Sequence, residues 1–428
     1  MDIRLSPACA VLALLASAVA TTPSSAQPTA GAVRPGISVL MSDSLHLIRG
    51  KRVALLTNQS GVDERGVSDI DRLVEPAAKA AGVQLVALFA PEHGIRGTED
   101  RTNLASEVDA KTGVVIHSLY GRTTTAPADS TLRDVDVLLV DLQDLGARPW
   151  TFPASMLYTL RAAGRNHVRI LLLDRPNPIG GVIVEGPMVD TALTNADDDQ
   201  PTRHAQPTSI FPIPLRHGLT LGEQARFYND ALHLGADLTV IPAAGWTRAQ
   251  WFDATGLPWV RPSPNMPSIT SAAFYAGMVS LEPTNLSVGR GTDSAFQHFG
   301  APWMNAKKVA ARLRALKLPG VSFEVDAFTP IKPGDSKYGG RRCEGVRMTI
   351  TDRQAFRSTL TAAAVVWAVG REHPKKLRVQ PVGFDRTFGG PGLREALLAG
   401  EQPAAVLARH DVRVAAFRSR LAPYLLYP

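Results

Sequence analysis

The stretch Val168-Arg169-Ile170-Leu171-Leu172-Leu173-Asp174 is a nearly continuous apolar run that ends in a carboxylate. Val135 to Val140, followed by Asp141, repeats the pattern, and Arg52 to Thr57 and Val83 to Ala90 are two further runs. Continuous rather than alternating apolar runs are typical of strands buried on both faces of a parallel sheet. Helical patterns stand between the runs, so we predict an α/β fold with a doubly wound, mostly parallel sheet. The polar strand ends should open into a crevice where a ligand binds.

Capping residues mark the starts of two helices. Ser68 precedes apolar positions that recur at helical spacing as far as Ala77, which predicts a helix over this segment. Thr220 and Glu223 form a T-x-x-E capping box before a second helix. Asp237 to Ile241 then supplies a further strand.

The pattern changes from about residue 300, where a basic helix over Ala306 to Leu316 begins a new region. Strands separated by helices follow in the segments Val321 to Val325, Val346 to Ile350 and Leu377 to Val382. We therefore predict a catalytic domain over residues 37–300 and a smaller α+β domain over 301–428. The length of 428 residues, 45% of them hydrophobic, also favours two domains.

The first residues are typical of a secretion signal. Arg4 precedes an apolar run from Ala8 to Ala20, which is shorter than the roughly 20 residues that a membrane span needs. We predict a signal peptide over residues 1–26, a linker over 27–36, and export to the periplasm or the outside of the cell. Cys343 is the only cysteine after this segment, so we expect no intramolecular disulfide and no stable membrane anchor, and a buried, small apolar role for its side chain.

The formal net charge of +7 would attract acidic polymers, although such an excess more often serves solubility. Lys and Arg are scattered and aromatic residues are sparse, so we expect no nucleic-acid partner. The sequence lacks an H-E-x-x-H helix, paired cysteines and an EF-hand loop, and we expect no metal. It also lacks a G-x-S-x-G elbow. Neither a G-x-G-x-x-G motif nor a P-loop follows the first strand, where Thr57 to Gly61 stands instead. We therefore predict a Rossmann-like sheet that binds no cofactor.

Acidic residues at the predicted strand ends are the candidates for catalysis. Glu92 follows one strand, and Glu185 follows the apolar run Val182-Ile183-Val184. Two carboxylates at one sheet edge can divide acid and base roles, as glycoside hydrolysis requires. The alternative for either glutamate is a helix cap or an ion pair. His93 either orients Glu92 or has a structural role.

A polar, glycine-containing stretch includes Asn265, Asn285 and Arg290, which could direct hydrogen bonds to a ligand, although a surface loop is the alternative. Arg290 or Arg148 could hold a carboxylate through a bidentate pair. The candidates for substrate binding are Asn58, His93, Asp144, Arg148, Asn177, Asn265, Asn285 and Arg290.

These segments together resemble the exo-β-N-acetylmuramidase family of NamZ type, bacterial peptidoglycan glycosidases formerly described as a domain of unknown function. The resembling segments are Leu56 to Gly61, Phe89 to Gly94, Asp141 to Phe152, Asp174 to Pro187, Pro212 to Pro214 with His217-Gly218, Ser263 to Ser268, Thr284 to Thr292, Lys337 to Gly340, and Cys343 with Gly345-Val346. The chain departs from the family pattern at Pro283 and Val288, where Gly and Glu are usual.

The resemblance implies a Rossmann-like domain with a smaller C-terminal domain and an active site in the cleft beside the sheet. It also implies that Glu92 and Glu185 are catalytic and that the enzyme releases terminal N-acetylmuramic acid from the non-reducing end of peptidoglycan fragments, as in cell-wall recycling. The lactyl carboxylate of that sugar would suit an arginine partner. Two alternatives stay open, a non-catalytic binding protein for cell-wall glycan and a hydrolase of another acidic sugar. Retaining, inverting and substrate-assisted mechanisms also stay open.

Overall fold

The computed structural model describes residues 32–96, 107–120, 125–194 and 208–428. The predicted signal peptide lies outside these residues, as does half of the predicted linker, residues 27–31. No helix in the described part of the chain is long and apolar enough to cross a membrane.

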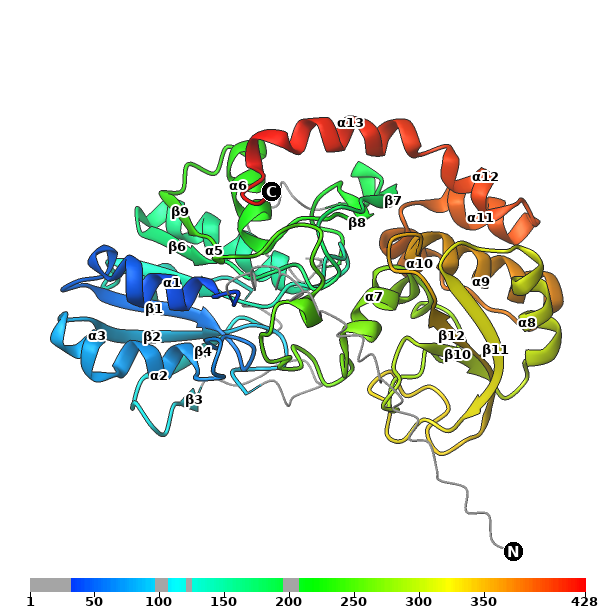
Figure 1. Cartoon of the computed structure of the whole chain (residues 1–428), viewed down its shortest axis with the longest axis horizontal. Helices are drawn as coiled ribbons and strands as arrows, with labels where there is room; N and C mark the ends of the chain where they lie inside the picture. The colour runs from blue at the N-terminus through cyan, green and yellow to red at the C-terminus, as the bar shows by residue number, and fades with distance from the viewer. Residues whose placement is uncertain (1–31, 97–106, 121–124, 195–207) are drawn as a thin grey trace, which may run out of the picture. The chain divides into compact units, whose positions relative to one another are not determined.

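The central sheet has seven strands in the order β3-β4-β2-β1-β5-β6-β9, all parallel except β3, which is antiparallel to β4 (Figure 1). The strands are β1 (Arg52–Thr57), β2 (Gln84–Ala90), β3 (Glu107–Val108), β4 (Val115–Ser118), β5 (Val137–Asp141), β6 (Arg169–Leu173) and β9 (Leu238–Ile241). The predicted mostly parallel sheet and its five predicted strands are therefore confirmed.

Successive residues of each central strand belong to two different apolar layers, because side chains alternate across a strand. In β1, Val53 and Leu55 pack with one layer, and Ala54 and Leu56 pack with the other. Helices cover both faces, as a doubly wound sheet requires. These helices are α1 (Gly36–Asp43), α2 (Asp69–Val74), α3 (Pro76–Ala80), α4 (Asp129–Leu132), α5 (Phe152–Asn166) and α6 (Leu221–Ala231).

The capping predictions are confirmed, with one difference in helix length. The Ser68 hydroxyl accepts a hydrogen bond from the Asp71 amide at the start of α2, and Thr220 and Glu223 form both bonds of a capping box at α6. The helix predicted to reach Ala77 ends earlier. Pro76 begins the separate helix α3, because proline has no amide hydrogen to continue the preceding helix.

Glu185 does not lie at the edge of the central sheet. It is the first residue of β7 (Glu185–Met188), which pairs with β8 (Pro214–Arg216) in a separate two-stranded sheet. The expectation that Val182 to Val184 forms a strand ending at the same sheet edge as β2 is therefore wrong. Val182 lies in a bend, Ile183 and Val184 have no regular secondary structure, and the strand begins only at Glu185.

The smaller C-terminal domain contains an antiparallel sheet of order β10-β12-β11, packed with helices (Figure 1). Its elements are α7 (Ile269–Met278), the 3-10 turn η4 (Val279–Leu281), β10 (His298–Ala301), α8 (Ala306–Ala315), β11 (Val321–Phe328), β12 (Cys343–Ile350), α9 (Ser358–Glu372), α10 (Pro381–Phe388), α11 (Pro391–Ala399), α12 (Pro403–Ala408) and α13 (Asp411–Leu421). The predicted helix and two of the predicted strands are confirmed, and the domain boundary predicted after residue 300 stays a prediction.

The strand predicted over Leu377 to Val382 is wrong. Val379 makes an isolated bridge to Thr284, and α10 begins at Pro381, whose fixed φ suits the first position of a helix. Cys343 is fully buried, as predicted, and it is a free cysteine in the described part of the chain.

Candidate functional site

Polar residues follow the parallel strands at one edge of the central sheet. Thr57, at the end of β1, is in register with Asp141 at the end of β5, and Asn58 follows directly. Glu92 comes two residues after the end of β2, the other neighbour of β1. Because the carboxyl ends of parallel strands meet at one edge, this edge is the expected place for a ligand.

Glu92 lies in a tight turn that fixes its backbone. His93 and Gly94 both adopt left-handed conformations, with φ of 72° and 74°, and the Gly94 amide donates to the Pro91 carbonyl at 3.1 Å. A left-handed histidine costs free energy and is uncommon outside functional or turn positions. The Thr151 hydroxyl, at the start of α5, donates to Glu92 Oε2 at 2.5 Å. Glu92 is half-buried, so its carboxyl group is oriented and still reachable.

Asn58 offers a directed donor at the same edge. Its Oδ1 accepts hydrogen bonds from the Ser60 amide at 3.0 Å and the Ser60 hydroxyl at 2.6 Å, which orients the amide group. Asn58 is 3% exposed, and its Nδ2 has no partner among the described residues. A buried donor without a partner carries a desolvation penalty of roughly 1–3 kcal/mol, which a ligand could relieve.

A cluster of buried charged residues lies at the ends of the same strands. Arg175 donates through two nitrogens to the carboxylate of Asp141, and Asp69 lies 3.9 Å from the same guanidinium. Burial and the charge of Asp141 raise the pKa of Asp69 well above its usual value. All three side chains are almost fully buried, so this cluster holds β5, β6 and α2 together and does not face a ligand.

Asp144 is buried, and its pKa is raised to about 7, chiefly by desolvation. Its Oδ2 accepts from the Gly146 amide at 2.8 Å and lies 3.6 Å from His217 Nε2. Burial lowers the pKa of His217 to about 3, so the histidine is neutral and the contact is not an ion pair. The environment of Asp144 is that of the interior.

Three predicted substrate-binding residues are occupied by contacts that hold the fold. Arg148, 2% exposed, donates to the carbonyls of Pro187, Ile213, Arg386 and Thr387. Asn177 is fully buried and bonds the Leu219 carbonyl and the Ile179 amide. Asn285 joins its loop to the Lys376 carbonyl and the Arg378 amide. Their proposed roles toward a substrate stay predictions.

Asn265 is partly buried in the loop before α7, where its amide donates to the Ser263 hydroxyl at 3.3 Å. Arg290 is partly exposed and forms an ion pair with Glu282 at 2.8 Å. The sequence analysis did not single out Glu282, although it stands in the same stretch as Asn285 and Arg290. It also missed Thr151, because a threonine near a helix start carries no distinct signal.

Glu185 accepts hydrogen bonds from the amide and hydroxyl of Ser358, at 2.9 and 3.1 Å, and from the Thr359 hydroxyl at 2.8 Å. Its carboxylate also lies 3.5 Å from a nitrogen of the buried Arg216. These contacts are at the N-terminus of α9, whose own N-cap residue, Arg357, supplies no side-chain cap. Glu185 therefore caps that helix across a large sequence separation.

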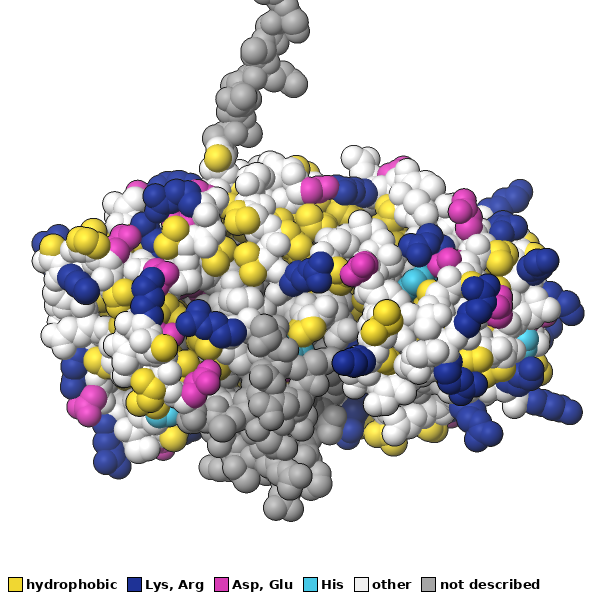
Figure 2. All heavy atoms as spheres, turned by 90° about the horizontal axis from the view of Figure 1, so that it is seen from below, with side chains coloured by type: hydrophobic (Ala, Val, Ile, Leu, Met, Phe, Trp, Pro, Cys, Tyr) yellow, Lys and Arg dark blue, Asp and Glu magenta, His cyan; other side chains and the backbone are white. Residues whose placement is uncertain are grey.

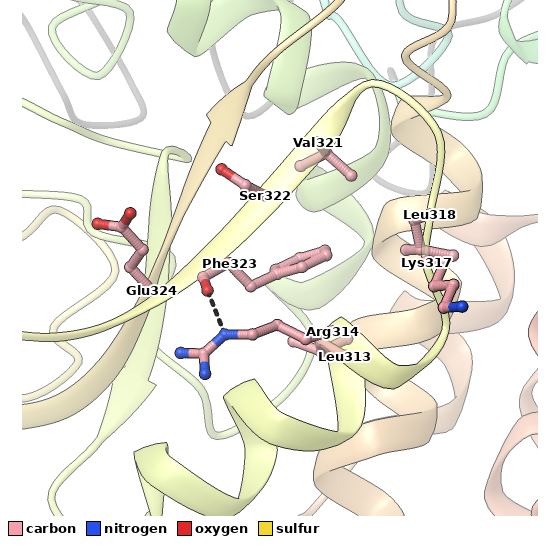
Figure 3. A pocket seen from close by; sticks show the side chains of 8 residues that line it. All are labelled: Leu313, Arg314, Lys317, Leu318, Val321, Ser322, Phe323 and Glu324. Atoms are coloured by element: carbon pink, nitrogen blue, oxygen red, sulfur yellow. Dashed lines mark hydrogen bonds between the residues drawn. The ribbon is translucent and has the colours of Figure 1, made fainter.

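Neither the charged surface nor a hollow beside α8 coincides with the predicted site. Figure 2 shows Lys and Arg side chains spread over one face with Asp and Glu between them, rather than gathered in a stripe. A hollow of about 460 Å³ lies between α8 and β11, with Leu313, Lys317 and Phe323 in its lining (Figure 3). None of the predicted site residues lines this hollow.

Comparison with known proteins gives consistent results. Residues 53–270 match a family model described as "Exo-beta-N-acetylmuramidase NamZ, N-terminal", and residues 273–427 match its C-terminal counterpart. The chain is 36% identical to the peptidoglycan beta-N-acetylmuramidase NamZ of Bacillus subtilis (strain 168), with 96% of each chain covered.

Two crystal structures of DUF1343 family proteins from Bacteroides fragilis NCTC 9343 have the same fold. One is 33% identical with a TM-score of 0.81, and the other is 28% identical with a TM-score of 0.73. Each alignment covers 92% of this chain and 99% of the other. The two family models together span most of the sequence, and the chain belongs to the exo-beta-N-acetylmuramidase NamZ family.

Proposed function

We propose that this protein is an exo-acting β-N-acetylmuramidase that hydrolyses terminal N-acetylmuramic acid from the non-reducing end of peptidoglycan fragments, with Glu92 as its proton donor. The observation that carries the proposal is the position of Glu92. It lies at the carboxyl edge of the sheet, in a strained turn, with its carboxyl group oriented by Thr151. A glycosidic oxygen needs such a positioned acid when its bond to C1 breaks.

The same edge supports recognition of an acetamido sugar. Asn58 Nδ2 is a fixed donor that needs an acceptor, and a sugar hydroxyl or an amide oxygen would supply one. The lactyl carboxylate of muramic acid requires a cation. Arg290 is 20% exposed, whereas Arg148 is enclosed by backbone carbonyls, so Arg290 is the better of the two predicted arginines for this role.

Export is part of the proposal, because peptidoglycan lies outside the cytoplasm. The segment from Arg4 to Ala26 has the basic start, apolar middle and small residues of a secretion signal. The mature protein would act in the periplasm or outside the cell. Fractionation of cells that produce the full chain, with N-terminal sequencing, tests this. A protein that keeps Met1 and stays in the cytoplasm would contradict it.

The activity is tested with the mature protein and two chromogenic substrates, a β-N-acetylmuramide and the matching β-N-acetylglucosaminide. We expect selective release from the muramide, and loss of at least about a hundredfold in kcat for Glu92→Gln with substrate binding retained. Binding without turnover by the unaltered protein would support a glycan-binding protein instead. Equal turnover of both substrates would contradict the assigned sugar.

A further inference from the structure

The contacts of Glu185 do not suit the second carboxylate of the reaction. Glu185 is 10% exposed and both of its oxygens already accept hydrogen bonds from the start of α9. A catalytic carboxylate must instead approach C1 or the attacking water. Glu282 is another carboxylate with a connection to Glu92.

A chain of contacts connects Glu282 to the site of Glu92. Glu282 stands seven residues after Tyr275, at the end of the continuous helical segment formed by α7 and η4. Because the last part of this segment is a 3-10 turn, Glu282 lies about two turns after Tyr275, roughly 12 Å further along the axis. The Tyr275 hydroxyl donates to the Pro149 carbonyl at 3.1 Å. Pro149 is two residues before Thr151, which bonds Glu92.

The charges of both glutamates act on the same phenol. Burial raises the pKa of Tyr275 well above its usual value, and the charges of Glu282, then Glu92 and then Asp144 raise it further. The guanidinium of Arg290 acts on the same group in the opposite direction. The charges of Glu92, Glu282 and Arg290 thus all act on one buried tyrosine, although Glu92 is far from the other two in the sequence.

Glu282 is both reachable and fixed. Its side chain is 26% exposed, and that of its ion-pair partner Arg290 is 20% exposed. The Lys337 ammonium donates to the backbone carbonyls of Glu282 at 2.6 Å and of Leu286 at 3.2 Å. These bonds hold the loop that carries both members of the ion pair. A partly exposed carboxylate on a fixed backbone is the arrangement that a catalytic base needs.

We infer that Glu282 is the second carboxylate of the reaction and that it works opposite Glu92 in hydrolysis, with Arg290 orienting it. This rests on the proposed function. Glu92 gives its proton to the glycosidic oxygen as the C1–O bond breaks. Water forms the new bond to C1, and its proton passes to the Glu282 carboxylate. One water is consumed, and the products are the free sugar and the shortened glycan alcohol. Glu185 then has a structural role as the cap of α9.

The experiment compares four variants of the mature protein, Glu92→Gln, Glu185→Gln, Glu282→Gln and Glu282→Ala, on a chromogenic β-N-acetylmuramide. We expect Glu282→Gln to lower kcat by at least about a hundredfold while KM and the melting temperature stay close to those of the unaltered protein. In Glu282→Ala, added azide should restore release of the chromophore. Azide needs no base, and it forms the bond to C1 in place of water, giving a glycosyl azide.

Glu344→Gln is the matched control, because Glu344 also pairs with an arginine, Arg342, at 3.3 Å, but on the exposed surface of β12. It should keep full turnover. Full turnover in Glu282→Gln, or a loss matched by unfolding and not rescued by azide, would overturn the inference. If Glu92→Gln alone is inactive in that case, the proposed function stands. If Glu92→Gln keeps full turnover, the assignment of Glu92 as the proton donor fails, and if the unaltered protein does not release the chromophore, the proposed function itself fails.

Discussion

Replacing Glu185 by Gln should destabilise the protein and leave the chemistry of the active site intact. The carboxylate accepts three hydrogen bonds from Ser358 and Thr359 and is the charge partner of Arg216, whose side chain is 1% exposed. Removing one partner of a buried ion pair costs roughly 3–5 kcal/mol. Gln keeps one acceptor oxygen, and Arg216 also donates to the Ile179 carbonyl at 2.7 Å. We therefore expect a loss of about 2–4 kcal/mol in the free energy of unfolding.

Urea unfolding followed by circular dichroism measures this loss, and kcat on the chromogenic muramide is measured below the unfolding transition. Glu324→Gln is the control, because Glu324 is exposed on β11, and it should change stability by no more than about 0.5 kcal/mol. If Glu185→Gln unfolds at the same urea concentration as the unaltered protein but has lost its turnover, the structural assignment of Glu185 is refuted.

Three other substitutions test the surroundings of the site. Thr151→Val removes the hydrogen-bond donor to Glu92 Oε2, and we expect kcat to fall by about tenfold or more with little change in melting temperature. An unchanged kcat would show that this bond does not orient the acid. Arg175→Met leaves Asp141 and Asp69 buried without their cation and should destabilise by about 3–5 kcal/mol in urea unfolding, whereas a neutral effect would mean that the cluster is dispensable. Asp144 has a pKa raised to about 7, so the native state binds more protons than the unfolded state between about pH 4 and 7, and stability falls as pH rises through that window. Asp144→Asn should flatten this fall, with the gap between the two proteins widening toward pH 8 by up to a few kcal/mol in urea unfolding; parallel pH curves would contradict it.

The central sheet could be predicted because each of its strands carries its own signal. Val53 to Leu56 is apolar at every position, and such a run is buried on both faces whatever its partners are. The capping box at Thr220 is equally local, since both of its bonds join residues three apart. The strand predicted over Leu377 to Val382 failed because Pro381 starts a helix, which outweighs the β-propensity of the valines.

The candidate site was harder to predict, because the roles of its residues depend on distant partners. Arg148 and Arg290 have the same chemistry, and both stand in polar segments. The structure surrounds Arg148 with carbonyls that come from as far along the chain as Thr387, and leaves Arg290 partly exposed beside Glu282. The local sequence around the two arginines does not predict this difference in exposure. Asn58 was correctly placed at a strand end, but only the three-dimensional contacts show that its Nδ2 has no partner among the described residues.

The two glutamates show why an acidic residue after an apolar run is ambiguous. Glu185 meets the start of α9, 173 residues further along the chain, and Glu92 meets Thr151, 59 residues further. In both cases the decisive neighbour is invisible in the local sequence. The neighbours have different consequences, because the start of α9 donates hydrogen bonds to both oxygens of Glu185, whereas the Thr151 hydroxyl orients the carboxyl group of Glu92 through one oxygen. The Glu282 carboxylate is likewise oriented by one side chain, that of Arg290, and is partly exposed. Its spacing from Tyr275 is readable from the sequence, but the hydrogen bond from Tyr275 to the Pro149 carbonyl, which joins segments 126 residues apart, is not.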